Sequence, residues 1–312
     1  MRHDGLMATP RSQLVDSEYA LHYHLISRCV RRSWLCGFDK PSQKKYDHRK
    51  LWLEERLFHL AKYFAVEIDA YSILSNHFHL VVFYDPLACQ LWDDADVAWR
   101  WFEVFPPRVA PNHAQDSAAL KEIRRDEMMN DPIQLEKARL ALGSLSTFMK
   151  HLKQPIAWRA NREDNCTGHF FESRFYSGAL LSEHAVLATM AYVDLNPVRA
   201  KISDTIESYE HTSIYKRLQH LETSPEQLHE MLRPLVSGLG YSTLPRPMPL
   251  ADYISHLRML SSPPKGNMTD EQATWFSRVA SIRKRQRAYG PMDKLKNWVA
   301  RHGWRRVGDA LV

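Results

Sequence analysis

Two neighbouring stretches of the chain are rich in β-branched and aromatic residues, and a short polar turn separates them. They span residues 66–74 and 77–84, and this arrangement predicts a β-hairpin. Side chains alternate between the two faces of a strand, so His77 and His79 share one face of the second strand. The pattern therefore places two imidazoles next to each other on a rigid surface.

The spacing of apolar residues predicts most of the other elements. These are a strand near 22–30, helices at 48–64 and 132–152, an extended segment at 168–181 that ends in a strand, and a helix at 183–196. Ser182 suits the N-cap of the last helix, and Pro197 is expected to end it. Residues 249–312 have a helical pattern broken by two proline-containing segments.

Residues 85–132 do not continue this pattern and are interpreted as an insertion, partly helical and partly loop. The segment begins with an acidic stretch that contains three tryptophans and continues through three prolines. Its aromatic side chains are suited either to packing the core of the insertion or to stacking on unpaired bases. Core packing is the simpler interpretation.

Composition places the chain among ordinary globular proteins. Of its 312 residues, 44% are hydrophobic and 25% are charged, and no run of 18 apolar residues occurs. We expect neither a membrane span nor a secretory signal. The four cysteines are scattered without a CxxC pair, which favours a reduced, cytoplasmic setting over a disulfide framework or zinc ribbon.

The net charge of +6 is concentrated near the carboxyl end. Residues 278–306 contain ten Lys or Arg and a single acid, Asp293, which leaves 32 basic and 35 acidic residues elsewhere. Such a cluster is typical of a contact with a polyanion, although a solvated helix face would have the same composition.

The predicted helix at 183–196 carries two polar residues one turn apart. On a helical wheel Met190 lies in the apolar face that we expect to pack on the sheet, and Tyr192 and Asn196 lie on the other side. Small residues share their side and leave room for a ligand. Asp194 falls near the apolar face, where a hydrogen bond to a basic residue such as Arg174 is one interpretation.

These residue types suit one chemistry when they are combined. An amide oxygen and two imidazoles can bind Mg²⁺ or Mn²⁺, which would draw charge from a phosphate while a phenol attacks it. A free phenol has a pKa of about 10, so it needs help in losing its proton. No sequence feature identifies a general base.

Structural interpretations stay open for several of these residues. The two histidines of the hairpin could be ordinary core or surface residues, and so could His22 and His24, which form a second same-face pair. Tyr176 lies in the extended segment without a ligand at helical spacing. Tyr209 and Tyr215 follow the Pro197 break and are weaker nucleophile candidates than Tyr192.

Two motifs resemble a known group of enzymes. The stretch Ser75-Asn-His-Phe-His-Leu-Val-Val82 is similar to the HUH motif of single-tyrosine transposases. Tyr192-Val-Asp-Leu-Asn-Pro-Val-Arg-Ala200 resembles the tyrosine-bearing helix of the REP-associated tyrosine transposases, which ends in Asn-Pro-Val-Arg/Lys. The segments 168–181 and 22–32 resemble the same group, so the likeness covers roughly residues 10–215.

The resemblance implies an α+β fold, with a central antiparallel sheet and helices packed on its faces (the ferredoxin-like HUH arrangement). The predicted order of elements agrees with it. We expect residues 1–215 to form this domain, with the insertion at about 85–132, and residues 216–312 to form a mostly helical, basic extension. The insertion and the extension depart from the smallest members of the group.

The resemblance also implies a transposase that nicks and rejoins single-stranded DNA. Tyr192 would form a 5′-phosphotyrosine, and His77, His79 and Asn196 would bind Mg²⁺ or Mn²⁺. The substrate class is hairpin or palindromic DNA with flanking single strands. Two alternatives are an HUH replication initiator or relaxase and a domesticated hairpin-binding protein that does not cut DNA.

Basic residues near these motifs and in the tail are candidate DNA contacts. They are Arg28, Arg31, Arg32, Arg174, Arg199, Lys201, Arg283, Lys284, Arg285 and Arg287. The oligomeric state, monomer or homodimer, stays open, and so does the choice between a metal site in the same subunit and one in a partner.

Overall fold

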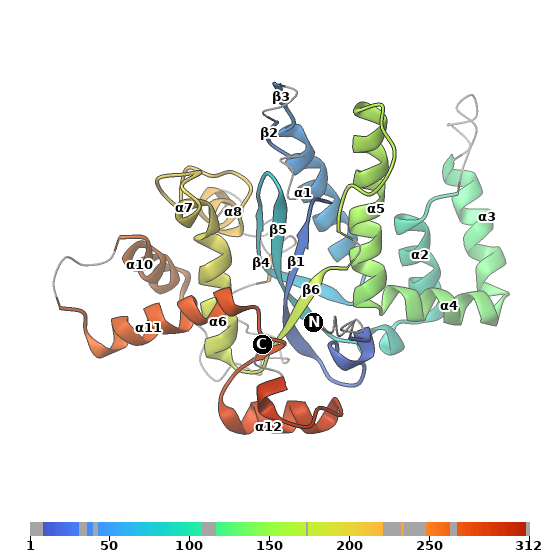
Figure 1. Cartoon of the computed structure of the whole chain (residues 1–312). Coiled ribbons are helices and arrows are strands. Elements are labelled where there is room, and N and C mark those ends of the chain that lie inside the picture. The colour runs from blue at the N-terminus through green and yellow to red at the C-terminus, as the bar shows by residue number, and fades with distance from the viewer. Residues whose placement is uncertain are drawn as a thin grey trace, which may run out of the picture.

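A five-stranded sheet runs through the centre of the molecule (Figure 1). The computed structural model describes residues 9–30, 36–39, 43–107, 117–172, 174–220, 232–233, 248–262 and 267–309. In the strand order β4-β5-β1-β6-β7, the elements are β4 (Val66–Ile73), β5 (His77–Tyr84), β1 (Leu21–Arg28), β6 (Tyr176–Leu180) and β7 (Ala288–Tyr289). The first four are antiparallel, and β7 joins β6 in parallel. The predicted α+β class, with its antiparallel sheet and helical C-terminal region, is confirmed.

The predicted hairpin forms between β4 and β5. The Leu74 amide donates to the His77 carbonyl across a distance of 2.9 Å and closes the turn. Strand β1 then pairs with β5, which brings Arg28 opposite His77 and His24 opposite Val81. Directly opposed residues lie on the same face of a sheet, so β1 and β5 together fix which side chains meet.

One side of the sheet, here called the apolar face, holds the alternate residues Tyr23, Leu25, Phe78, Leu80 and Val82, all of them buried. Helices α1 (His48–Ala61) and α5 (Leu145–Glu163) pack in the same core cluster. Their apolar residues recur every three or four positions, which gives each helix a stripe that can cover the sheet.

The other side, here called the histidine face, holds His24 and His79 beside Val81 and Ala70. Helix α6 (Glu183–Asp194) contacts β4, β5 and β6 on this side. Helices α10 (Leu250–Ser261) and α11 (Asp270–Ser281) belong to the C-terminal extension of residues 216–312, here called the tail, and share the core cluster of α6. Because α6 packs against both the sheet and the tail, nearly all of its residues are buried.

The insertion contains η3 (Ala88–Leu91), α2 (Asp94–Val104), α3 (Ser117–Met129) and α4 (Pro132–Leu142). The Arg139 guanidinium joins two of them, donating to the Cys89 carbonyl and to the Asp94 carboxylate at 2.7 Å each. Trp101 packs against Phe105, with ring centroids 4.3 Å apart. Tryptophans of the insertion thus take part in packing within it.

The single helix predicted at 132–152 is wrong, because two helices occupy this region. Helix α4 ends at Leu142 with Gly143 as its C-cap, and the Ser144 hydroxyl caps α5 by accepting from the Thr147 amide at 3.2 Å. Helix α5 also continues through Pro155 to Glu163, beyond the predicted end at residue 152. A turn of only two residues between two helical patterns has little effect on the apolar spacing.

The tail ends with α12 (Met292–Arg301), which packs near the amino end of the described chain, where the Trp304 indole donates to the Gln13 carbonyl. The short elements are η1 (Arg11–Gln13), β2 (Phe38–Asp39), β3 (Lys44–Lys45), α7 (Asn196–Arg199), α8 (Ser213–His220), η5 (Ile282–Lys284) and η6 (Val307–Asp309). Among the described residues, no helix is both long and apolar enough to span a bilayer.

Candidate active site

His79 is the centre of a chain of hydrogen bonds on the histidine face. Its Nε2 lies 3.0 Å from the Asn196 side-chain amide, and its Nδ1 lies 2.9 Å from Nε2 of His24. If the amide donates to Nε2, the ring proton of His79 must be on Nδ1, where His24 accepts it. The Nε2 lone pair of His79 is thereby aimed toward Asn196.

His77 is held in the matching tautomer at the edge of the same face. Its Nδ1 lies 2.6 Å from the Asn76 side-chain oxygen, an acceptor, so the ring proton belongs on Nδ1 and the lone pair on Nε2. The His77 and His79 ring centroids are 5.0 Å apart. Burial lowers the pKa of His77 to about 4, and burial together with the neighbouring histidines lowers that of His79 well below its usual value. Both rings are therefore neutral at pH 7.

Tyr192 lies over the histidines, and this corrects the predicted orientation of its helix. Its ring centroid is 5.7 Å from that of His79 and 6.0 Å from that of His24. Tyr192 thus contacts the sheet, although the helical wheel placed it on the side of the helix away from the sheet. The helical wheel was ambiguous because the tail also covers α6. Apolar residues therefore occur on several sides of the helix and do not identify the side that packs on the sheet.

Asn196, the first residue of α7, contacts His79 from just beyond the end of α6. The helix ends at Asp194, and Pro197 occupies the first turn of α7, where its missing N–H costs nothing. The expected break at Pro197 therefore takes the form of a new short helix. Asp194 accepts from the Ser213 and Tyr253 hydroxyls at 2.5 and 2.7 Å, so its interpreted bond to Arg174 is wrong.

Two arginines act on the Tyr192 phenol. The Arg199 guanidinium carbon lies 5.7 Å from the centre of its ring. Burial raises the pKa of Tyr192, whereas the positive charges of Arg199 and Arg283 oppose that rise. The phenol is half-buried among cations, and cations favour the ionised form.

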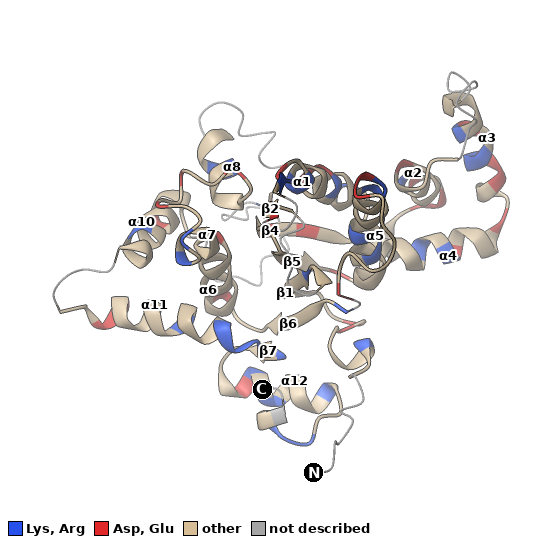
Figure 2. Ribbon diagram, turned by 45° about the horizontal axis from the view of Figure 1, so that its top comes forward, with Lys and Arg blue, Asp and Glu red and all other residues tan. Residues whose placement is uncertain are grey.

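The basic tail reaches this site from the far end of the chain. Figure 2 shows Lys and Arg along the segment between α11 and β7. The backbone of Arg285 is left-handed, with φ +53°, and the positive charge of Arg285 reinforces burial in lowering the pKa of His24 to about 3. A Cβ at Gly178 would lie only 2.8 Å from the Gln286 carbonyl, so glycine lets the tail approach β6 closely.

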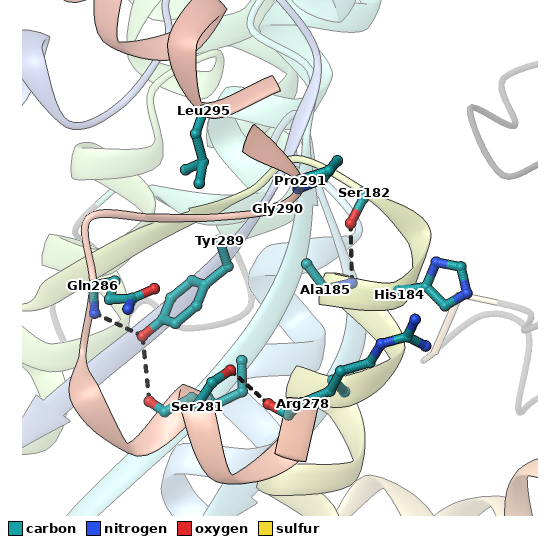
Figure 3. Close-up of a pocket in the computed structure, with 12 residues that line it drawn as sticks. Ser182, His184, Ala185, Arg278, Ser281, Gln286, Tyr289, Gly290, Pro291 and Leu295 are labelled. Carbon is teal, nitrogen blue, oxygen red and sulfur yellow. Dashed lines mark hydrogen bonds between the residues drawn. The ribbon is translucent and has the colours of Figure 1, made fainter. Parts of the chain in front are cut away.

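A cavity of about 500 Å³ lies where this tail meets α6. Ser182, Ala185 and Tyr289 are on its lining, and Figure 3 shows them around one space. Ala185 and Ala188, which also lines it, share a helical stripe with Tyr192. The small residues of that stripe therefore border open volume one to two helical turns from Tyr192.

The predicted DNA contacts fall into four groups. Four arginines lie near the site: Arg199, Arg283, Arg285 and Arg28. The Nε atom of Arg28 is buried and has no hydrogen-bond partner among the described residues. Two arginines have partners elsewhere, because Arg174 donates to the Thr9 carbonyl and Arg287 stacks on Trp304. Lys201 and Lys284 are exposed. Arg31 and Arg32 lie outside the described residues.

The donor set fits a hard divalent cation. His77 and His79 each present one lone pair, and rotation of the Asn196 amide about its terminal bond would offer its oxygen beside His79. In the described part of the chain, no cluster of three His, Cys, Asp or Glu side chains has metal-binding spacing. A cation here would depend on the amide as its third protein ligand.

His24 is a functional candidate to which sequence reasoning gave little weight. Its bond to His79 is of the kind that fixes the tautomer of a metal-binding histidine. The two-residue spacing of His22 and His24 was a signal, but only strand pairing shows which of them meets His79. His22 is bonded to Arg233 instead, at 3.0 Å.

Comparison with known proteins adds little to this geometry. No protein-family model matches the chain, and no curated protein matches it. One solved structure that matches is that of a REP-associated tyrosine transposase bound to a REP hairpin. It aligns with 78% of this chain and 100% of its own, at 11% identity and a TM-score of 0.37, and so low a score carries no argument about the site.

Proposed function

We propose that this protein is a metal-dependent single-stranded DNA endonuclease and strand transferase, with Tyr192 as its nucleophile. The supporting observation is the convergence of Tyr192, His79 and Asn196, from separate elements of one chain, beside His77. The resemblance of the two motifs to single-tyrosine transposases agrees with this geometry. Hairpin or palindromic DNA is the proposed substrate class.

The chain's own residues would carry the reaction. The Tyr192 hydroxyl gives up its proton to solvent, and its oxygen attacks the phosphorus of a phosphodiester. The bond to the 3′ oxygen breaks, and that oxygen takes up a proton from solvent and leaves as a free 3′-OH. The 5′ phosphate stays on the tyrosine. Attack by a 3′-OH on the phosphotyrosine reverses these steps, and because one ester replaces another, no ATP is needed.

Positive charge would stabilise the pentacoordinate phosphate. Arg199 and Arg283 lie close enough to affect the pKa of Tyr192, so they are also placed to bind the phosphate that this residue attacks. His77, His79 and Asn196 would hold Mg²⁺ or Mn²⁺. When bound, the cation would supply Lewis acidity toward a phosphate oxygen.

The test is an adduct assay with labelled hairpin oligonucleotides that carry flanking single strands, drawn from the DNA around the gene. With Mg²⁺ or Mn²⁺ we expect a covalent protein–DNA band on a denaturing gel. Tyr192→Phe should lower its formation by about 10⁴-fold or more, as loss of a nucleophile does. Tyr215→Phe, a change on α8, is the matched control.

Two results would contradict the proposal. An adduct that persists in Tyr192→Phe would place the nucleophile elsewhere. Tight hairpin binding without cleavage under either metal would instead identify a non-catalytic hairpin-binding protein.

A further inference from the structure

A groove beside α5 contains an aromatic ring that makes no ring, cation or hydrogen-bond contact with the described residues. Its volume is about 560 Å³, and it lies between α5 on one side and residues 168–172 and Phe175 on the other. Trp158 of α5 lines it with 62% of its surface exposed. Among the described tryptophans, Trp158 is the one for which no ring, cation or hydrogen-bond contact is found. A large exposed ring without packing to explain it suits a ligand with a flat face.

The residues around Trp158 form one continuous stripe of α5. Those that line the groove recur every three or four positions: Ser146, Met149, Lys150, Lys153, Gln154, Ala157, Trp158 and Asn161. At 1.5 Å per residue the stripe is about 22 Å long, enough for several nucleotides of a single strand. Lysines occupy one half of it and the indole the other.

Charge along the groove favours an anionic ligand. Lys150 is exposed and has no hydrogen-bond or ion-pair partner among the described residues. Burial and the nearby Arg11 lower the pKa of Lys153 to about 8. Arg11 lies over the ring of Phe175, another lining residue. Glu172 is the single acid on the lining, and its carbonyl, rather than its carboxylate, accepts from Lys153.

The wall opposite α5 connects the groove with the candidate active site. The Glu172 amide donates to the Arg28 carbonyl at 2.8 Å, and the Val30 amide donates to the Phe170 carbonyl at 3.0 Å. Arg28 is also the residue that pairs with His77 across the sheet. Residues 170–172 therefore border the groove and also adjoin the end of β1 that lies beside His77.

We infer that this groove binds single-stranded DNA continuous with the strand held at Tyr192, an inference that rests on the proposed function. A base stacks on the Trp158 indole, and phosphates contact Lys150 and Lys153. Stacking tolerates any base because every base has a π face, so the groove accepts single strands with little sequence preference.

The test is a binding titration of fluorescein-labelled dT12 by fluorescence anisotropy, with the full chain carrying Tyr192→Phe so that no covalent adduct forms. Trp158→Ala should weaken binding about 5- to 100-fold. Lys150→Gln should lower the dependence of log K on log salt by about 0.7. Trp99→Ala and Lys137→Gln, exposed residues outside the groove, are matched controls that should change neither quantity.

A second measurement locates the strand. Irradiation of dT12 that contains 5-bromodeoxyuridine should cross-link it to peptides containing Trp158 or residues 169–175. Cross-links confined to the tail would overturn the inference, and so would dT12 binding unaffected by Trp158→Ala. Equal competition by a blunt 12-base-pair duplex would overturn the preference for a single strand.

The outcomes separate this inference from the proposed function. If hairpins form the Tyr192 adduct but Trp158→Ala binds dT12 normally, the inference about the groove is wrong and the proposed nuclease activity is supported. If Trp158→Ala weakens binding but no metal supports an adduct, the groove stands and the nuclease fails.

Discussion

The two faces of the central sheet are built from the same strands and differ in what they carry. On β5, Phe78 and Leu80 enter a core of aliphatic and aromatic side chains, whereas His77 and His79 face α6 and the tail. Because side chains alternate between the two faces, neighbouring residues of one strand belong in turn to the core and to the candidate active site. Rigid packing on the apolar face positions the histidines on the other.

Substitutions of two adjacent residues of β5 give the most direct test of the different roles of the two faces. His77→Ala should lower the rate of adduct formation at least about 10²-fold, because it removes a candidate ligand, while the thermal midpoint stays nearly unchanged. Phe78→Ala should cost about 3–5 kcal/mol of unfolding free energy, because it leaves a cavity in the core. Denaturant unfolding and the adduct assay on both variants measure this. Comparable losses of stability in the two variants would contradict the division between the faces.

A second pair of variants tests the histidine face alone. His24→Ala should raise the Mn²⁺ concentration needed for half-maximal activity about 10- to 100-fold, because His79 loses the partner that orients it. His22→Ala removes an equally buried ring on the same strand that contacts Arg233 instead. An equal shift in both variants would mean that His24 acts only through packing.

Loss of one positive charge near Tyr192 is expected to have a smaller effect on the rate of adduct formation. Arg283→Gln should slow adduct formation about tenfold, since a single charge that acts on Tyr192 and its phosphate is lost. Lys296→Gln, an exposed change on α12, should leave the rate alone. The readout is the single-turnover rate at low and high salt, and a rate equally reduced in both variants would indicate a general charge effect.

The smallest expected effect concerns only the support of α6. Ser182→Ala removes the cap on the Ala185 amide and should cost about 1 kcal/mol of stability. Ser261→Ala, whose hydroxyl donates to a carbonyl at the end of α10, lacks that role. Thermal melts of the two variants should therefore differ by about 1–2 °C.

Local patterns predicted the elements on which the site stands. The hairpin at 66–84 and the Ser182 cap depend on neighbouring residues alone, and both are found as expected. The separation of α4 from α5 was missed because the two residues between them barely shift the helical spacing. Strand β7, only two residues long, has too little alternation to be recognised.

Long-range packing decided the rest. The face that Tyr192 presents depends on the tail helices, which bury the other sides of α6 and remove the contrast that a wheel needs. The bond from His24 to His79 depends on the pairing of β1 with β5. The predicted roles of Tyr192, His77, His79 and Asn196, of the cation and of the DNA contacts stay predictions, although the first four residues now lie together.

The pairing of β6 with β7 has a consequence for the time at which this molecule becomes complete. Ala179 pairs with Ala288, so more than a hundred residues must be synthesised after β6 before its outer edge is covered. Until the ribosome reaches the tail, Arg283 and Arg285 do not exist, and α6 lacks the helices that bury it. A nascent chain thus carries the histidines and the tyrosine long before the charges beside them, and the site can form only after residues 283–289 have been synthesised.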